Sequence, residues 1–460
     1  MERDYDVIVI GSGAAGLSAA VAAADAGASV LVVEGDTRVG GSSRLSGGHF
    51  YAAGTSVQEQ AGIIGDTADA MFEHYMTLNQ WLVDPAVVRR YCDLSAPTFE
   101  WLKDLGVAFH KETVYPSGVG STPRGHPPDG GGEEVVNVLD GHRSHKGVDM
   151  VLDSRVTGLI QDADGRVRGI QIGDDSASCA AVVLATGGFG ANAEMIAKYY
   201  PQAAASGDWS WYIGTDGAQG DGITLGESVG ATIAGHDRGL LLVTPGFSHD
   251  LEVLLPGWLI LVNSHGRRFA NEAAPYTVLG GLIQREGGSA WAVFDEEARR
   301  LAKPNPASQA YWVDEVLERK ADEGRICRAD TLDALAEMMA VDAVGLTGTV
   351  DRYNADVQTG ADSAFFKTQG LRAISKPPFY GVELRPAIVC WTGTGLRIDA
   401  DTRVLGRNEK PVPGLYAAGE TVGNLHGDRY VGGGGSFGPC IVFGKLAGEN
   451  AATLSAALND

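Results

Sequence analysis

The chain has 460 residues, with 36 lysines and arginines against 58 aspartates and glutamates, which gives a formal net charge of −22. This charge argues against nucleic acid and anionic lipid as partners, because both select a basic surface. Hydrophobic residues make up 44% of the chain and charged residues 20%, which excludes an intrinsically disordered protein. The length is about three times the ~150-residue prior for one domain, so we expect two domains.

Glycine is the compositional outlier, with 64 residues, about twice the usual ~7%. The glycines fall in clusters without a G-X-Y period, which indicates backbone brought close to a ligand rather than collagen.

The five cysteines are scattered and form no CxxC pair. This pattern predicts a reduced, cytoplasmic protein without a zinc or iron–sulfur site. No signal peptide precedes the first strand and no run of 18 apolar residues occurs, so we expect no membrane span.

The chain begins with a βαβ pattern. Val7–Ile10 predicts a short strand, Gly11–Gly16 is rich in glycine, and a helix of small residues follows. Ser29–Val33 predicts a second buried strand, which closes on Glu34. A second stretch of small residues, Gly40–Gly48, comes directly afterwards.

Helical, loop and strand patterns follow in turn. Residues 68–105 have a helical pattern, and residues 116–132 hold Pro, Gly and Asp without periodicity, which predicts a loop. A hairpin is expected at Asp164–Gly165, and Val182–Gly188 predicts a strand that ends in glycine.

The middle of the chain differs in composition from both ends. Residues 238–391 contain charged helical stretches, at 295–301 and 330–341, and the glycine-rich character then returns toward the C-terminus. We therefore expect an α/β fold, in which a Rossmann-like nucleotide-binding domain is made of residues 1–237 and 392–460. An α+β substrate or capping domain, residues 238–391, is inserted into it.

The first glycine cluster has the form of a dinucleotide-binding turn. Gly11 permits the tight turn, Gly13 lets a pyrophosphate approach the backbone, and Gly16 lets helix and strand pack closely. An acid at the end of the second strand, here Glu34, accepts hydrogen bonds from a ribose 2′-hydroxyl. Because strand, glycines, helix, second strand and acid occur in order, the sequence predicts dinucleotide binding.

Three further segments favour FAD over NAD. The glycine- and serine-rich loop after Glu34 lies where flavoproteins make further phosphate and flavin contacts. Gly414–Glu420 is a strand-to-glycine step, and Gly435–Pro439 opens a last apolar helix, whose N-terminus would stabilise a reduced, anionic flavin. FAD is therefore the predicted cofactor, without a metal. The residues predicted to bind it are Gly11, Ser12, Gly13, Ala15, Gly16, Glu34, Gly41, Ser42, Ser43, Ser46, Gly47, Gly48, Val156, Ala185, Thr186, Gly187, Asp221, Gly419, Glu420, Ser436 and Phe437.

Taken together, several segments resemble the flavoprotein superfamily of fumarate reductases and 3-ketosteroid dehydrogenases. This resemblance covers nearly the whole chain and implies an FAD-binding domain and a flavin-dependent oxidoreductase that acts on CH–CH groups. It does not choose the reaction. The segments that carry it are Gly11–Gly16, Ala185–Gly190, Gly220–Gly222, Arg268–Glu272 and Gly414–Glu420.

Two segments resemble the dehydrogenases more than the reductases. The reductases carry an arginine four residues past the position of Glu272, as proton donor to the substrate alkene, whereas this chain has Tyr276 there. The Tyr430–Pro439 segment is similar to a glycine-rich motif of the ketosteroid Δ1-dehydrogenases. In that family the hydroxyl and the N–H that match Tyr430 and Gly434 bind the ketone oxygen.

The resemblance implies roles that suit desaturation beside a ketone. Tyr430 O–H and Gly434 N–H would stabilise the developing enolate by roughly 3–4 kcal/mol per donor, and Tyr276 would take the α-proton. A tyrosine with a pKa near ~10 is a poor base at neutral pH, so that pKa must be lowered or the proton relayed. Tyr115 is the nearest match to a second tyrosine that assists in the dehydrogenases.

The chain also departs from both patterns. Arg429 belongs to a His-Gly-x-Arg element that resembles the carboxylate-binding segment of the reductases. It can grip a substrate carboxylate, lower the pKa of Tyr430, or be solvated. Trp391 stands near the place of a substrate-binding histidine of the reductases, and we expect it to contact substrate. With a carboxylate grip, a small ring such as 4-oxocyclohexanecarboxylate fits better than a steroid.

The sequence thus predicts an FAD-dependent dehydrogenase that forms a C=C bond α,β to the carbonyl of a cyclic ketone, either a 3-ketosteroid or a small ring ketone. An electron acceptor such as oxygen or a quinone would reoxidise the flavin. Two alternatives remain, an enoate reductase of the fumarate type and a non-catalytic flavin-binding subunit of a larger complex.

Overall fold

The computed structural model describes residues 3–251, 254–303, 311–427 and 429–459. The chain divides into two compact units. The first comprises Met1–Ala204, Tyr212–Leu240 and Cys390–Asp460, and the second comprises Ala205–Trp211 and Leu241–Val389. Residues 205–211, expected in the first domain, cluster with the second unit in the structure.

The first unit is built on a largely parallel sheet. Among the described residues, its eight strands follow the order β18-β19-β9-β1-β2-β6, with β8 paired to β9 and β7 to β8. β1 runs parallel to β2 and β9, and all four residues of β2 are buried, as expected for a strand covered on both faces. The expected hairpin at Asp164–Gly165 joins β7 to β8. The strands are β1 (Tyr5–Ile10), β2 (Val30–Val33), β6 (Asp149–Val151), β7 (Gly158–Gln161), β8 (Val167–Ile172), β9 (Asp175–Leu184), β18 (Arg403–Leu405) and β19 (Pro411–Ala417).

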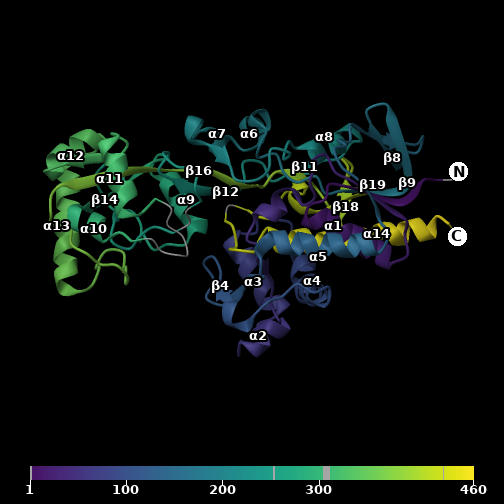
Figure 1. Ribbon diagram of the computed structural model, residues 1–460, viewed down its shortest axis with the longest axis horizontal. Helices are drawn as coiled ribbons and strands as arrows, with labels where there is room; N and C mark the ends of the chain where they lie inside the picture. Colours follow the sequence, from purple (N-terminus) through teal and green to yellow (C-terminus); the bar gives the residue numbers. More distant parts are fainter. Residues whose placement is uncertain (1–2, 252–253, 304–310, 428, 460) are drawn as a thin grey trace. The chain divides into compact units, whose positions relative to one another are not determined.

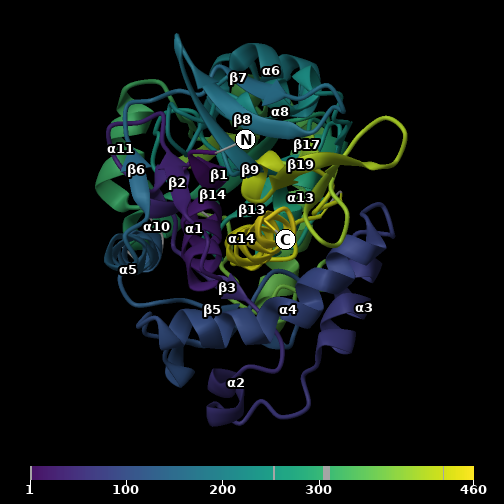
Figure 2. The same ribbon diagram turned by 90° about the vertical axis from the view of Figure 1, so that its right-hand side faces the viewer.

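Helices α1 (Ala14–Asp25) and α14 (Phe437–Ala457) lie side by side (Figures 1 and 2). A Cβ atom at Gly444 would stand 2.2 Å from the carbonyl oxygen of Ala15, so only glycine lets the two backbones approach this closely. Gly419 lies against Ala15 and Cys440, at the N-terminal ends of both helices. The packing therefore brings β19 and the two helix N-termini to one place.

A small sheet in the first unit has the order β3-β5-β4. Its strand β5 lies within residues 116–132, where the sequence analysis expects a loop, so that expectation is wrong for β5. The strand forms because Phe50 pairs with His126 from far along the chain, which local composition does not reveal. The three strands are β3 (Phe50–Tyr51), β4 (Tyr115–Pro116) and β5 (Pro123–His126).

The helical pattern expected over 68–105 is confirmed as α3 and α4. The remaining elements complete the first unit. They are η1 (Gly41–Leu45), α2 (Ser56–Gln60), α3 (Ala68–Leu78), α4 (Pro85–Asp104), η2 (Lys111–Thr113), α5 (Gly131–His145), α6 (Ala193–Tyr199), α7 (Pro201–Ala204), α8 (Asp221–Ser228), β11 (Ile233–Ala234), β17 (Gly395–Leu396) and η4 (Gly419–Thr421).

The second unit is an α+β structure. β14 pairs antiparallel with both β13 and β16, and β15 pairs antiparallel with β16. The helices expected at 295–301 and 330–341 are confirmed as α10 and α12, and the expected α/β fold with an α+β insertion is confirmed. The elements outside the first unit's list are η3 (Gly207–Trp209), β10 (Trp211–Tyr212), β12 (Gly239–Thr244), β13 (Ile260–Val262), α9 (Tyr276–Arg285), β14 (Ala290–Asp295), α10 (Glu296–Leu301), α11 (Asp314–Asp322), β15 (Cys327–Ala329), α12 (Leu332–Met339), α13 (Ala343–Thr359) and β16 (Phe379–Thr392).

Within the described ranges, no helix combines the length and the apolar character needed to cross a membrane.

Candidate functional site

The turn between β1 and α1 depends on two glycines. Gly11 has a φ of +101°, and a Cβ atom there would stand 2.3 Å from the carbonyl oxygen of Ala185. A Cβ atom at Gly16 would stand 1.9 Å from the carbonyl oxygen of Gly11. Gly13 then precedes α1 without a side-chain cap, and the first turn holds no acidic residue. The helix N-terminus therefore offers partial positive charge and backbone N–H groups to an anion.

A cavity of about 680 Å³ opens at this turn, entirely within the first unit. It is bordered by the ends of β1, β2, β9 and β19 and by the loop around η1, so most of the predicted FAD-binding residues come together there. Those that line it are Gly11, Ser12, Gly13, Ala15, Glu34, Gly41, Ser42, Ser43, Val156, Ala185, Thr186, Gly187, Asp221, Gly419 and Glu420.

Six residues predicted to bind FAD do not line the cavity, namely Gly16, Ser46, Gly47, Gly48, Ser436 and Phe437. A Cβ atom at Gly48 would stand 2.6 Å from the backbone N of Gly132, so this glycine serves close packing against α5. The Ser46 hydroxyl donates to the carbonyl of Ser43 at 2.8 Å and closes a turn. A cofactor contact for these six residues stays a prediction.

Glu34 ties the turn to the second strand. One carboxylate oxygen accepts the backbone N–H and the hydroxyl of Ser12, at 2.7 and 2.6 Å, and the other accepts the N–H of Asp36 at 2.8 Å. A carboxylate has about four lone pairs, so one on the second oxygen is left. Glu34 lines the cavity, so this lone pair leaves the predicted ribose contact chemically possible.

The cavity fits an elongated anionic dinucleotide. Gly41 and Gly187 line it, and a Cβ atom at either would meet no protein atom within 4 Å, so the space above these two glycines is open to a ligand. Arg44 also lines the cavity, and its buried Nε has no acceptor among the described residues. A buried N–H needs an acceptor, and a phosphate oxygen supplies one. The N-terminus of α1 would then hold the diphosphate and Glu34 a ribose.

Sequence reasoning missed several lining residues. Arg155 pairs with Asp221 at 2.7 Å, and the loop 214–218 and Cys440 also border the cavity. The cluster of Gly, Asp and Thr at 214–218 was a turn signal that could have been used, whereas Arg44 and Arg155 carry no local signal.

The Tyr430 hydroxyl lies at the N-terminus of α14. It accepts the backbone N–H of Ser436 at 2.9 Å and makes a second hydrogen bond with the Ser436 hydroxyl at 2.9 Å. Burial raises the pKa of Tyr430 above its ordinary value, so the phenol keeps its proton. Gly434 has a φ of +94°, and a Cβ atom there would stand 2.6 Å from the backbone N of Tyr51. Both predicted ketone-binding residues therefore belong to one tightly packed loop.

His426, which received no role from the sequence, is buried behind this loop. Its Nε2 faces the carbonyl oxygen of Gly435 at 2.8 Å, and its Nδ1 faces the Tyr75 hydroxyl at 2.9 Å. The ring contacts Tyr430, with centroids 4.9 Å apart, and Trp391, with centroids 4.7 Å apart. Burial lowers the pKa of His426 to about 4, so the ring is neutral at pH 7. Trp391 is buried in this cluster, and its contact with substrate stays a prediction.

Tyr115 comes to the same loop from β4. Its hydroxyl lies 2.6 Å from Nδ1 of His49, and a Cβ atom at Gly433 would stand 2.3 Å from the Tyr115 oxygen. The structure thus brings Tyr115, Tyr430 and Gly434 onto one loop region of the first unit. Arg429 is half-buried and directly precedes Tyr430.

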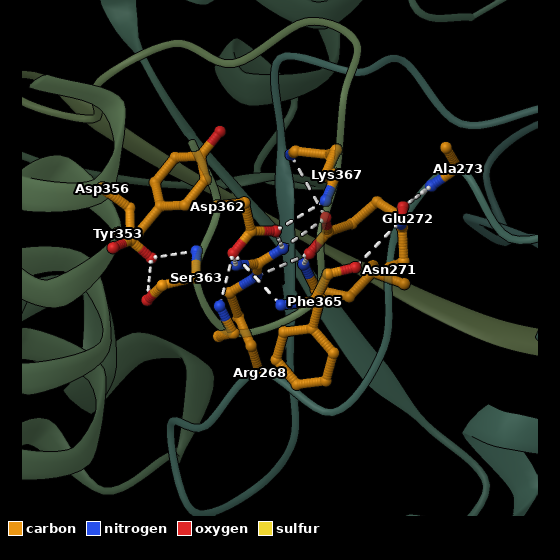
Figure 3. A network of polar contacts seen from close by, with 12 residues as sticks. Arg268, Asn271, Glu272, Ala273, Tyr353, Asp356, Asp362, Ser363, Phe365 and Lys367 are labelled. Carbon is orange, nitrogen blue, oxygen red and sulfur yellow. Dashed lines mark hydrogen bonds and ion pairs between the residues drawn. The ribbon is translucent and has the colours of Figure 1, made fainter. Parts of the chain in front are cut away.

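Tyr276 belongs to the second unit, where it is the first residue of α9. Its partnership with Tyr430 stays a prediction. The segment that leads to Tyr276 is held by a buried network of charges (Figure 3). Arg268 pairs with Glu272 and with Asp362, each at 2.9 Å. The buried Lys367 lies 3.1 Å from Glu272.

The network fixes the backbone before α9. Glu272 also accepts the N–H of Leu261 on β13 at 3.1 Å, and the Asn271 side chain donates to the carbonyl of Phe365 at 3.1 Å. Buried charges are stable only when paired and hydrogen-bonded, as they are here. The acid and amide of the 268–272 segment thus have structural partners, which tie the segment before Tyr276 to β13 and to the backbone at Phe365.

A protein-family model described as "FAD binding domain" matches residues 6–436. The chain belongs to this family. It is therefore a flavoprotein with FAD as cofactor, an oxidoreductase that acts on carbon–carbon bonds.

The relatives and solved structures include both reductases and dehydrogenases. The chain is 33% identical to the fumarate reductase (cytochrome) of Shewanella frigidimarina, over 98% of this chain and 77% of that protein. The crystal structure of 3-ketosteroid Δ1-dehydrogenase from Sterolibacterium denitrificans matches with a TM-score of 0.83 at 26% identity, covering 98% of this chain and 99% of that one. That of 3-ketosteroid Δ4-(5α)-dehydrogenase from Rhodococcus jostii RHA1 matches with a TM-score of 0.80 at 27% identity, covering 98% of both chains.

Proposed function

We propose that the protein is an FAD-dependent dehydrogenase that introduces a C=C bond α,β to the carbonyl of a cyclic ketone. The observation that carries this proposal is the position of the Tyr430 hydroxyl at the N-terminus of α14, where its oxygen accepts the Ser436 N–H. A hydroxyl that accepts such a bond is polarised and becomes a stronger donor. When the Ser436 hydroxyl donates to Tyr430, the tyrosine's own hydrogen is left for a carbonyl oxygen.

Tyr430 and the Gly434 N–H would together bind the ketone oxygen. Two donors aimed at this oxygen stabilise the enolate that forms as the α-proton leaves, by roughly 3–4 kcal/mol per donor in good cases. Gly434 suits this task because its positive φ and its close packing against β3 fix the backbone that carries this N–H. When bound, FAD supplies the acceptor for the β-hydrogen as hydride.

Tyr276 would take the α-proton. The paired charges around Arg268 and Glu272 hold the preceding segment in place, so the tyrosine's ring starts from a fixed backbone. An ordinary tyrosine has a pKa of about 10 and is a poor base at neutral pH, so Tyr276 must pass the proton to another group. Tyr115 would assist in this step.

The proposed substrate is a ring ketone, and a role for Arg429 in binding would restrict the class of ring ketone. If the guanidinium, half-buried beside Tyr430, binds a carboxylate, the substrate is an oxo acid such as 4-oxocyclohexanecarboxylate. A neutral 3-ketosteroid would make no use of this charge. An electron acceptor, oxygen or a quinone among the candidates, would then reoxidise the enzyme.

A second candidate function is an enoate reductase of the fumarate type. It is favoured by the 33% identity to the Shewanella frigidimarina fumarate reductase. Against it stands Tyr276, in the position where the reductases carry an arginine that protonates the alkene.

Product analysis separates the two candidates. The enzyme is incubated with a redox dye as electron acceptor and, one at a time, a 3-ketosteroid, cyclohexanone and 4-oxocyclohexanecarboxylate, and the product is identified by mass. Loss of two hydrogens with appearance of enone absorbance supports the dehydrogenase. No product from any ketone, together with reduction of fumarate or another enoate by the dithionite-reduced enzyme, supports the reductase instead.

A further inference from the structure

His49 and Tyr115 form a close pair in the first unit. The Tyr115 hydroxyl lies 2.6 Å from His49 Nδ1, and the two rings meet edge to face with centroids 5.6 Å apart. His49 comes from the chain just before β3, and Tyr115 begins β4, so strands on either side of β5 bring the two side chains together. Sequence reasoning singled out Tyr115 but gave no role to His49.

The pair lies against the loop that carries the proposed ketone donors. A Cβ atom at Gly433 would stand 2.3 Å from the Tyr115 oxygen and 3.1 Å from His49 Nδ1. One residue further on, a Cβ atom at Gly434 would stand 3.0 Å from the carbonyl oxygen of His49. The Ser117 hydroxyl donates to the carbonyl of Gly433 at 3.2 Å and holds the loop from the same side. The Tyr115 oxygen is thus a near neighbour of Gly434.

The protonation of the two groups gives their hydrogen bond a direction. Burial raises the pKa of Tyr115, so the phenol keeps its proton at neutral pH. Burial lowers the pKa of His49, so its ring is neutral at the same pH. A neutral imidazole has one donor and one acceptor nitrogen. The phenol therefore donates to Nδ1, and the ring proton is on Nε2, on the edge beside Gly47.

We propose that His49 is a positioning residue that orients Tyr115 and accepts its proton while the ketone is desaturated. This inference rests on the proposed function. It adds to that function a route by which the α-proton leaves the buried site.

The proton passes from the ketone to solvent through Tyr115 and His49. When a proton from the ketone reaches the Tyr115 oxygen, the original O–H bond of Tyr115 breaks and an N–H bond forms at His49 Nδ1. The resulting imidazolium then loses the proton on Nε2 to water, because His49 is only half-buried. One proton passes from ketone to solvent, and no oxidant is consumed in the relay. The neutral ring is left with its proton on Nδ1, so before the next turnover it takes up one proton from solvent at Nε2 and gives up one from Nδ1, which restores the starting tautomer.

The relay predicts a particular pH dependence. Among the described residues, Tyr115 is the titratable group that hydrogen-bonds to the His49 ring, and the glycine backbones of residues 47 and 433 face it from the neighbouring loops. Protonation of His49 in acid removes its acceptor, so kcat falls as pH falls through the lowered pKa of His49. Above that pKa the ring is neutral and kcat reaches its plateau.

The test uses the FAD-loaded enzyme with the ketone that reduces it best. His49→Asn keeps a polar group near the place of Nδ1 but cannot take up a proton. We expect kcat at neutral pH to fall on the order of 10²-fold and the acid limb of the pH profile to disappear. Exchange of the ketone's α-hydrogens in D₂O, followed by NMR, should slow in parallel. His110→Asn is the matched control, since that histidine is half-exposed and hydrogen-bonds to Asp129 at 2.7 Å.

Tyr115→Phe and Gly433→Ala provide independent tests if His49→Asn does not fold. Tyr115→Phe removes the hydroxyl alone, and Gly433 has no positive φ, so alanine suits its backbone while its Cβ displaces the Tyr115 oxygen. Each should remove the same acid limb, and the double variant His49→Asn, Tyr115→Phe should be no slower than the slower single variant.

The possible outcomes are distinct. An acid limb that persists in His49→Asn or in Tyr115→Phe, with kcat lowered equally at every pH, means that the pair is only structural and overturns the relay while the dehydrogenase stands. A wild-type enzyme that no ring ketone reduces overturns the dehydrogenase, and the relay with it.

Discussion

The Tyr430 hydroxyl accepts the backbone N–H of Ser436 at 2.9 Å, so the side chain is fixed to the N-terminus of α14. That helix packs backbone to backbone against α1, whose own N-terminus borders the FAD cavity. Small residues thus couple the position of the proposed ketone donor to the position of the cofactor site.

Replacing Tyr430 with Phe removes the donor and keeps the ring's contact with His426. We expect kcat to fall about 10²–10³-fold with FAD content unchanged, as measured by steady-state kinetics and flavin absorbance. Tyr5→Phe is the control, because that hydroxyl bonds Asp149 near the surface. A loss of less than threefold in Tyr430→Phe would show that this hydroxyl does not bind the carbonyl.

Tyr276→Phe tests the proton acceptor. The ring and the start of α9 are preserved, so FAD should stay bound while turnover nearly disappears. Single-turnover reduction of the flavin should slow as much as steady-state turnover does, because proton removal is part of that step. Full activity of this variant would refute the assignment.

Alanine substitutions at Gly13 and at Gly16 should affect different properties, FAD affinity at Gly13 and protein stability at Gly16. Gly13 has a φ of −66°, and its added Cβ would meet Ser43 Oγ at 3.4 Å, an ordinary contact. Gly13→Ala should therefore fold and lose FAD affinity by about tenfold or more, about 1.4 kcal/mol, because the methyl group keeps the diphosphate from the backbone. Gly16→Ala should be unstable, since its Cβ would stand 1.9 Å from a carbonyl oxygen.

Fluorescence titration with FAD and thermal unfolding of the apoprotein measure these two effects separately. Wild-type affinity in Gly13→Ala would mean that the diphosphate binds elsewhere.

Arg429→Ala tests the substrate class. If the guanidinium binds a carboxylate, KM for 4-oxocyclohexanecarboxylate should rise at least tenfold, about 1.4 kcal/mol, while KM for cyclohexanone stays the same. Equal changes for both ketones would rule out a carboxylate grip and leave a role beside Tyr430.

The βαβ unit and most of the FAD cavity could be predicted from sequence because their signals are local. A β-branched run, glycines at fixed spacing and a terminal acid follow one another within the first 34 residues. Only glycine fits at positions 11 and 16, since any side chain there would overlap a carbonyl oxygen.

The pairing of His49 with Tyr115 could not be predicted in this way. The two residues are 66 positions apart, and their contact depends on β3 and β4 flanking β5, a strand hidden in a Pro- and Gly-rich stretch. The burial of His426 beside Tyr430 likewise results from long-range packing, with Tyr75 contributed from α3. Short strands and single contacts between distant segments leave no periodicity in the sequence.

The most direct test of the dehydrogenase is anaerobic. The purified, FAD-loaded enzyme is mixed without any electron acceptor with 4-oxocyclohexanecarboxylate, cyclohexanone or a 3-ketosteroid, and the absorbance of the oxidised flavin is followed in a stopped-flow instrument. We predict bleaching by at least one ring ketone, with the enone formed in equal amount. No bleaching by any ketone, with dithionite-reduced enzyme instead reoxidised by fumarate or another enoate, would contradict it.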